Sequence, residues 1–167
     1  WFRFRRLFAH LVINCGHDYY VLHASGIVAR NSNAALIVGE SNAGKTTLLA
    51  ALLGKGYRFL CDDYAPIRFD DLSVISMPTG ATLGERTFQL LPELADLKHK
   101  ACSFFTERQW HWTVNFREKY QVFPANTSAK IVHIFFVRSN FGQSSSIAPC
   151  HPAEAALRVI ESRLQGP

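Results

Sequence analysis

The stretch Ala-Ala-Leu-Ile-Val-Gly-Glu-Ser-Asn-Ala-Gly-Lys-Thr, residues 34–46, decides the fold of this chain. Its apolar first part, Ala34–Val38, is typical of a buried strand. The residues that follow, Gly39–Thr46, match the pattern G-x-x-x-x-G-K-S/T in full. A run of good helix formers, Thr46–Leu53, comes next and stops at Gly54. A strand before the loop and a helix after it are the context that this motif requires, so the sequence predicts a phosphate-binding loop.

Each fixed position of the loop has a physical task. Gly39 and Gly44 permit backbone angles that let successive N–H groups point inward and cradle phosphate oxygens. The positive end of the following helix also attracts the anion. Lys45 can reach the β- and γ-phosphate oxygens, and the Thr46 hydroxyl can ligate Mg²⁺. The other residues expected to lie at the nucleotide are the small loop residues and the residue after Thr46, namely Ser41, Asn42, Ala43 and Thr47.

Two consecutive carboxylates, Asp62 and Asp63, close the strand expected over Tyr57–Cys61. In an α/β sheet the strand ends meet at the edge where a ligand binds, so both carboxylates should arrive beside the phosphates. One can hold Mg²⁺, directly or through water, and the other can accept a proton from an incoming hydroxyl. Successive side chains of a strand point to opposite faces, so a shared site requires the chain to turn at this pair.

The rest of the chain reads as hairpins that alternate with a few helices. The turn Asn31–Asn33 joins strands expected over Gly26–Arg30 and Ala34–Val38, so a hairpin leads into the loop. Further strands are expected over Tyr19–His23, Ala65–Phe69, Ser73–Met77, Trp110–Phe116 and Ala129–Arg138. Further helices are expected over Leu83–Leu91, Pro92–Lys100 and Pro152–Leu164. The sequence therefore predicts one mixed α/β domain over residues 1–167.

The composition excludes several classes of protein. The chain has 167 residues, a net charge of +5 and 48% hydrophobic residues, which excludes a disordered chain. No apolar run approaches the roughly 18 residues that span a bilayer, so we expect no membrane span. Apart from Arg3–Arg6, the basic residues are dispersed, so nucleic acid is not an expected partner. The cysteines show no metal-ligand spacing and suit the reducing cytoplasm: Cys15, Cys61, Cys102 and Cys150.

The opening of the chain carries two expectations of its own. The sequence begins on Trp1 and its one methionine is Met77, so we expect a piece of a longer protein. The basic and aromatic segment Trp1–Leu7 lacks the features of a signal peptide. It is expected to be a helix face packed on the domain, ahead of the alternative of a membrane-surface patch. Association into oligomers is compatible with the sequence.

Three segments together resemble the catalytic domain of the HPr kinase/phosphorylase family: Leu22–Ser25, Gly39–Thr46 and Gly56–Asp63. The closest likeness is to the HPr-kinase-related branch found with gene clusters for modified, lasso-type peptides. The resemblance is specific over about residues 20–70 and loose beyond them. It implies a phosphoenolpyruvate-carboxykinase-like nucleotide fold, ATP with Mg²⁺, and phosphorylation of a serine hydroxyl on a protein or peptide.

The resemblance also implies roles for individual residues. Lys45 and Thr46 correspond to the phosphate and metal positions, Asp62 to the metal position and Asp63 to the base. His23, which alone is typical of a buried core histidine, corresponds to a partner of the acidic pair. The bifunctional members carry an acidic residue directly after the loop and an Arg-Gly-rich signature in their second half, and this chain has neither, so a kinase without phosphorylase activity fits better.

Two other functions remain open from the residues alone. Small-molecule kinases of the shikimate or nucleoside type also place acidic residues shortly after the loop helix. They normally begin with the strand that leads into the loop, whereas in this chain a strand pair precedes it. A regulatory module that binds nucleotide without transferring phosphate would lack a base or a metal ligand, and this chain retains Thr46, Asp62 and Asp63.

Overall fold

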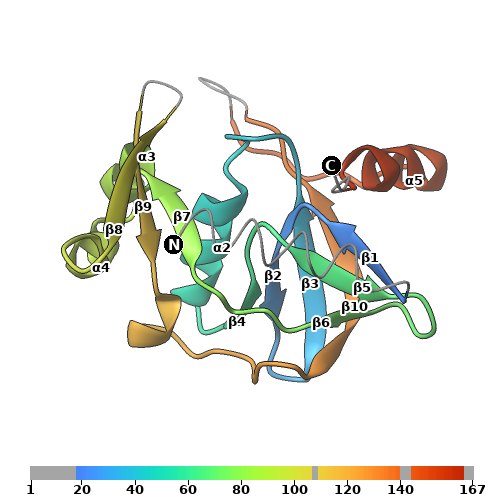
Figure 1. Cartoon of the computed structure of the whole chain (residues 1–167). Helices are drawn as coiled ribbons and strands as arrows, with labels where there is room; N and C mark the ends of the chain where they lie inside the picture. The colour runs from blue at the N-terminus through green and yellow to red at the C-terminus, as the bar shows by residue number, and fades with distance from the viewer. Residues whose placement is uncertain (1–17, 107–108, 140–143, 164–167) are drawn as a thin grey trace.

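The computed structural model describes residues 18–106, 109–139 and 144–163, and it is a mixed α/β structure (Figure 1). The helix expected over Trp1–Leu7 lies outside these residues. Within them, one sheet has the strand order β1-β5-β6-β10-β3-β2-β4 and a smaller one the order β7-β9-β8. The strands of the large sheet are β1 (Tyr19–Leu22), β2 (Ala24–Val28), β3 (Asn33–Val38), β4 (Arg58–Cys61), β5 (Ala65–Arg68), β6 (Ser73–Ile75) and β10 (Ser128–Phe136).

The small sheet and the helices complete the list of elements. The strands of the small sheet are β7 (Ala81–Gly84), β8 (Cys102–Thr106) and β9 (Gln109–Val114). The helices are α2 (Lys45–Leu53), α3 (Glu85–Leu90), α4 (Ala95–Lys98) and α5 (Pro152–Glu161), with 3₁₀ turns η1 (Pro92–Leu94) and η2 (Phe116–Glu118). None of the described helices is long and apolar enough to cross a membrane.

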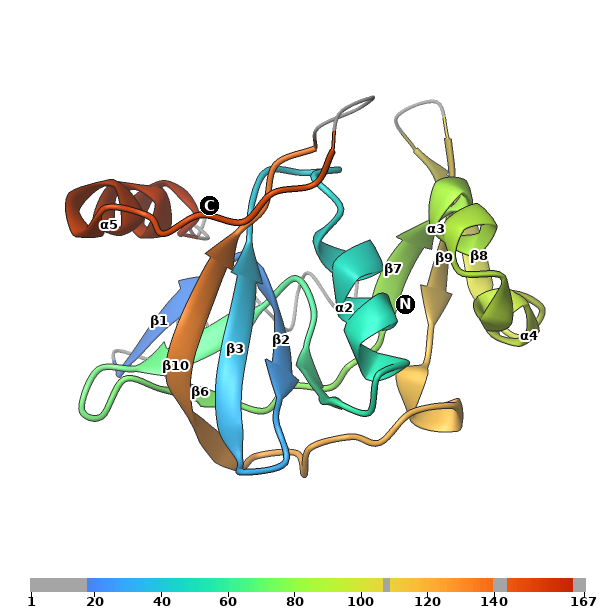
Figure 2. The ribbon, with the colours of Figure 1, turned by 180° about the vertical axis from the view of Figure 1, so that it is seen from behind.

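The strand directions bring three segments to one edge of the large sheet. β3 runs parallel to β10 and antiparallel to β2, and β2 runs antiparallel to β4. β3 and β4 therefore point the same way and end at the edge where β2 begins. Figure 2 shows β10, β3 and β2 side by side, with the loop after β3 leaving this edge toward α2. The phosphate-binding motif, the acidic pair and the start of β2 thus meet at one place.

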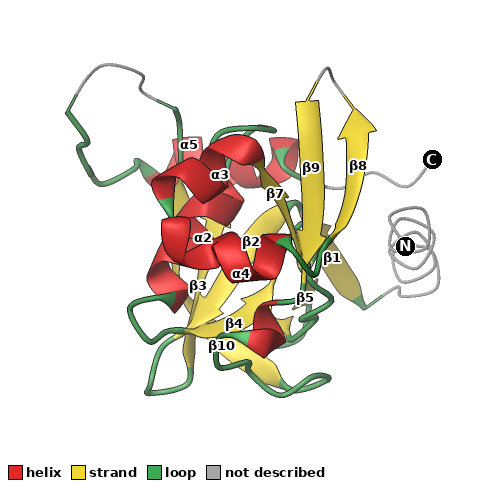
Figure 3. Cartoon of the chain, turned by 90° about the vertical axis from the view of Figure 1, so that its left-hand side faces the viewer, coloured by secondary structure: helices red, strands yellow, loops and turns green. Residues whose placement is uncertain are grey.

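β3 is buried on both faces, which explains why the run before the loop is continuously apolar. Leu36 and Val38 belong to a core cluster on one face, and Ile37 belongs to the cluster on the other. Helix α2 packs into the second cluster through Leu49 and Leu53. It contacts both β2 and β7, so it lies between the two sheets (Figure 1); Figure 3 colours the helices and strands by type. The start of α2 is therefore fixed from two sides.

The predicted hairpin that leads into the loop is confirmed, since β2 pairs antiparallel with β3. The strands expected over Ala65–Phe69 and Ser73–Met77 correspond to β5 and β6, which also pair antiparallel. The prediction of a helix over Leu83–Leu91 is wrong at its start, because residues 81–84 form β7 and α3 begins at Glu85. Leu83 pairs with Trp112 and is buried in the core, and this pairing outweighs the local preference for helix. The second expected helix is a 3₁₀ turn at Pro92 followed by the short α4. β8 was not predicted.

Candidate functional site

The loop between β3 and α2 needs its two glycines for different reasons. At Gly39 an added Cβ would lie 2.6 Å from the backbone oxygen of Val137, which directly follows β10. Gly44, just before α2, has a φ of 94°, a left-handed conformation that side chains rarely adopt. Asn42 also has a positive φ, of 63°, which asparagine tolerates better than most residues. The first glycine permits a close approach, and the second permits a turn.

This difference gives a prediction for stability. Gly39→Ala should lower the free energy of unfolding by about 1–3 kcal/mol, because the new methyl group collides with backbone. Gly44→Ala should cost about 1–2 kcal/mol through left-handed strain alone, since open space surrounds its Cβ position. Gly84→Ala is the matched control: it has open space and a φ of −89°, so a change within about 0.5 kcal/mol is expected. Urea unfolding of the three variants measures this, and equal stability of the Gly39 and Gly84 variants would contradict the close approach.

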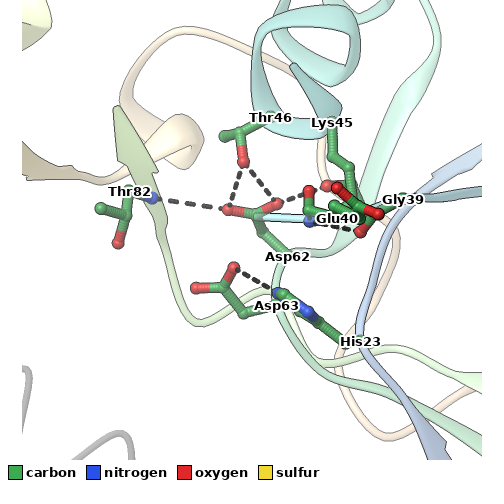
Figure 4. A network of polar contacts seen from close by, with 9 residues as sticks. His23, Gly39, Glu40, Lys45, Thr46, Asp62, Asp63 and Thr82 are labelled. Atoms are coloured by element: carbon green, nitrogen blue, oxygen red, sulfur yellow. Dashed lines mark hydrogen bonds and ion pairs between the residues drawn. The ribbon is translucent and has the colours of Figure 1, made fainter. Parts of the chain in front are cut away.

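The Lys45 ammonium is held beneath the loop. Its Nζ donates to the backbone oxygens of Gly39 and Glu40, each at 3.0 Å, and the residue is 6% exposed (Figure 4). Burial lowers the pKa of Lys45, because the cation loses water, while the charges of Asp63 and Asp62 act in the opposite direction. A cation that carries this desolvation cost is well suited to an anionic ligand, so the loop fits phosphate.

Asp62 is almost completely buried, at 1% exposure, and its carboxylate collects several donors. Its Oδ1 accepts from Ser25 Oγ at 2.6 Å and from Thr46 Oγ1 at 3.1 Å. Its Oδ2 accepts from the backbone N–H of Thr82 at 3.4 Å, and lies 3.3 Å from the Thr46 hydroxyl (Figure 4). The carboxylate therefore joins β2, α2 and β7 at one point.

Asp63 turns the chain directly after this carboxylate. Its φ is 66°, a left-handed value that ends the strand alternation, so both acidic side chains remain at the same sheet edge. Its Oδ1 lies 3.8 Å from His23 Nε2, and each of the two side chains is about one third exposed. This separation is within ion-pair range but longer than a hydrogen bond. His23 thus lies beside the acidic pair, at ion-pair distance from Asp63.

The oxygen atoms at this edge fit a magnesium ion. A hydroxyl and a carboxylate, from Thr46 and Asp62, are the hard oxygen donors that Mg²⁺ prefers. In the part of the chain that the structure describes, no three His, Cys, Asp or Glu residues gather into a metal cluster. Mg²⁺ is commonly bound by one or two carboxylates together with substrate phosphates, so this small donor set, beside a loop whose motif predicts phosphate binding, fits the ion.

The small residues of the loop differ in what holds them. The backbone oxygen of Asn42 accepts a hydrogen bond of 3.4 Å from Ser139, which ties the loop to the segment after β10. The backbone N–H of Ala43 donates to the oxygen of Glu40 at 3.2 Å, within the loop itself. Ser41 is exposed. The loop is therefore held by a hydrogen bond within its own backbone and by a second one from Ser139, in the segment after β10.

The residue after Thr46 joins two helices. The Thr47 hydroxyl lies 2.8 Å from the hydroxyl of Thr87 on α3. Because its side chain is engaged in this way, a contact of Thr47 with nucleotide would come from its backbone N–H, which lies in the first turn of α2.

Sequence reasoning missed three participants: Ser25, Thr82 and Thr87. Ser25 stands in the segment quoted for its histidine, but its contact with Asp62 depends on the pairing of β2 with β4, which no local pattern indicates. Thr82 acts through its backbone, which no side-chain pattern reveals. Thr87 lies on the helix whose start was predicted wrongly.

A cavity of about 490 Å³ lies elsewhere, between the small sheet and α4. It is lined among others by Gly80, Leu97, Thr113 and Arg117, and by none of the residues expected at the nucleotide. The candidate site is therefore defined by the chemistry of its side chains at the sheet edge, and not by this cavity.

No known family model and no curated protein matches this chain. Among solved structures, the chain is similar to the Hpr(Ser) kinase/phosphatase from Coxiella burnetii, at 16% sequence identity and a TM-score of 0.42. The similarity covers 79% of this chain and 67% of the other. It is a distant one, and nothing about activity or substrate follows from it.

Proposed function

We propose that this chain is an ATP-dependent phosphotransferase that transfers the γ-phosphoryl group to a serine hydroxyl of a protein or peptide. The observation that carries the proposal is the 3.1 Å contact between the Thr46 hydroxyl and the Asp62 carboxylate, beside the buried Lys45. These three groups come from the loop motif and from the acidic pair, and their chemistry suits a phosphate chain with its metal ion.

Each residue of the site has a role in this proposal. Bound ATP with Mg²⁺ would supply the phosphoryl group and neutralise part of its negative charge. Lys45 stabilises the charge on the phosphate oxygens, and Thr46 and Asp62 hold the metal ion, directly or through water. Asp63 accepts the proton of the acceptor hydroxyl, and His23 orients Asp63. The exposure of Asp63, about one third, supports this role because an acceptor must reach the base.

The serine acceptor rests on the sequence resemblance of residues 22–25, 39–46 and 56–63 to the HPr kinase family. A cytoplasmic location is part of the proposal. It is supported by free thiols at Cys102 and Cys150, which are exposed and would persist in a reducing compartment.

Transfer from labelled ATP tests the proposal. The protein is incubated with γ-labelled ATP, Mg²⁺ and, separately, serine-containing peptides, sugars and nucleosides. Label recovered as phosphoserine is the expected result. Label found only in a sugar or nucleoside would establish a small-molecule kinase instead. Nucleotide binding without transfer to any acceptor would favour a regulatory module, and the absence of Mg²⁺-dependent nucleotide binding would overturn the nucleotide site itself.

A further inference from the structure

Ser25 donates a short, fully buried hydrogen bond to the Asp62 carboxylate. The residue is 0% exposed, and its Oγ lies 2.6 Å from Asp62 Oδ1. A hydroxyl bonded to a carboxylate at this distance forms a charge-assisted hydrogen bond, which is stronger than one between neutral groups. Because the Ser25 hydroxyl donates to Asp62, we expect its influence on a reaction to pass through this carboxylate.

A β-bulge brings the two residues together. β2 and β4 pair Val28 with Arg58 and Ile27 with Phe59, but the next pair joins Gly26 to Cys61. Leu60 is thus an extra residue in β4.

The bulge decides which residue faces Asp62. With the register of Phe59 continued unbroken, Asp62 would lie opposite Ala24, which has no polar side chain. When the register after the bulge, Gly26 opposite Cys61, is continued by one residue, Ser25 comes opposite Asp62, to which its hydroxyl is bonded. Bulges next to functional sites commonly re-aim a side chain, and this one presents a hydroxyl to the carboxylate.

The position of Ser25 differs from that of Thr46, the other hydroxyl donor to Asp62 Oδ1. Thr46 has a second task in the proposed function, since its oxygen is also expected to ligate Mg²⁺. Ser25 has the single task of holding the carboxylate. A residue that supports a metal ligand in this way typically contributes 10–100-fold, as an order of magnitude, to metal affinity.

We propose that Ser25 is a positioning residue, which fixes the Asp62 carboxylate in the orientation that the Mg²⁺–nucleotide complex requires. This inference rests on the proposed function and deepens it, since it assigns Mg²⁺ dependence to a side chain outside the loop and the acidic pair. In this inference the bulge at Leu60 brings Ser25 opposite Asp62, and the Ser25 hydroxyl then holds the carboxylate.

The test measures Mg²⁺ dependence in the variant Ser25→Ala. Mg²⁺ is titrated at a fixed ADP concentration, and nucleotide binding is followed by calorimetry, so the readout does not depend on turnover. The Mg²⁺ concentration for half-maximal binding should rise by about 10-fold or more. At saturating Mg²⁺ the affinity for nucleotide and the transfer rate should return toward those of the parent protein.

Ser76→Ala is the matched control. Ser76 is also buried, at 1% exposure, and its hydroxyl donates to the backbone oxygens of Phe123, at 3.1 Å, and Leu60, at 3.5 Å, instead of to Asp62. Both variants lose the buried hydrogen bonding of a serine hydroxyl, so a general loss of stability should appear in both. Only Ser25→Ala should shift the Mg²⁺ requirement. An equal shift in both variants would show that Ser25 is merely structural and would overturn the inference.

A second variant and a second background make the test decisive. Ser25→Cys keeps the buried volume with a weaker donor, and it replaces Ser25→Ala if the alanine protein does not fold. In an Asp62→Asn background, Ser25→Ala should add little to the Mg²⁺ shift, because both changes disturb the same group. Parent-like Mg²⁺ dependence of both Ser25 variants would refute the inference alone. Failure of the parent to bind ADP with Mg²⁺ would instead refute the proposed function.

Discussion

Replacing Lys45 by methionine is expected to lower phosphoryl transfer by on the order of 10³–10⁵, the contribution of a cation that stabilises charge in phosphoryl transfer. Methionine keeps an unbranched chain of similar length but removes the ammonium group. The loss of transfer rate should therefore reflect the missing positive charge and not a change in packing. Lys45→Ala should give a loss at least as large, since it removes the side-chain stem as well.

The protein should remain folded in the methionine variant. Burial lowers the pKa of Lys45, so the native structure carries a desolvation cost for this cation that an apolar side chain avoids. The variant does lose the two hydrogen bonds to the backbone oxygens of Gly39 and Glu40. The two effects act in opposite directions, and we expect the free energy of unfolding to fall by no more than about 1–3 kcal/mol.

Lys55→Met is the matched control, because Lys55 is exposed and lies just beyond the other end of α2. It should leave transfer unchanged. The measurement is the rate of label transfer from γ-labelled ATP, together with urea unfolding of each variant. If the Lys45 variants bind and turn over ATP like the parent, the assignment of the loop as a phosphate site is wrong.

The elements around the loop could be predicted from the sequence because their signals are local. The expected strand Ala34–Val38 corresponds to β3, and the expected helix Thr46–Leu53 corresponds to α2, each to within one residue. Glycines, helix formers and an apolar run decide these elements within a short window. The acidic pair could be placed at the same edge because the direction of strands governs where their ends meet.

The small sheet and the bulge could not be predicted, because both depend on pairing between distant residues. Leu83 lies in a strand because it pairs with Trp112, and no sequence pattern near Leu83 indicates this partner. The extra residue Leu60 likewise appears only once β4 is set against β2. The role of Ser25 depends on this register, so it could not be predicted from the local sequence around Ser25.

Replacing each carboxylate of the acidic pair by asparagine is expected to lower phosphoryl transfer in a different way. Asp63 is about one third exposed and can be reached by an acceptor hydroxyl, whereas Asp62 is 1% exposed and bonded to the Thr46 hydroxyl. We therefore expect Asp63 to accept the proton and Asp62 to serve the metal ion. This division agrees with the roles that the sequence resemblance implies.

Asp63→Asn should keep the local structure, because asparagine tolerates the positive φ of 66° at this position. Nucleotide binding should survive, while the transfer rate should fall by on the order of 10²–10⁴, the usual contribution of a positioned base. A loose transition state would place the effect at the lower end of that range. Raising the Mg²⁺ concentration should not restore the activity, since the missing group is a proton acceptor.

Asp62→Asn should behave in the opposite manner. The amide keeps one oxygen but loses the negative charge that attracts the metal ion, so more Mg²⁺ is needed for half-maximal activity. Raising the Mg²⁺ concentration should then restore part of the transfer rate. The measurement is the transfer rate against Mg²⁺ concentration for both variants. An Asp63→Asn protein rescued by Mg²⁺, beside an Asp62→Asn protein that no Mg²⁺ concentration restores, would reverse the two roles.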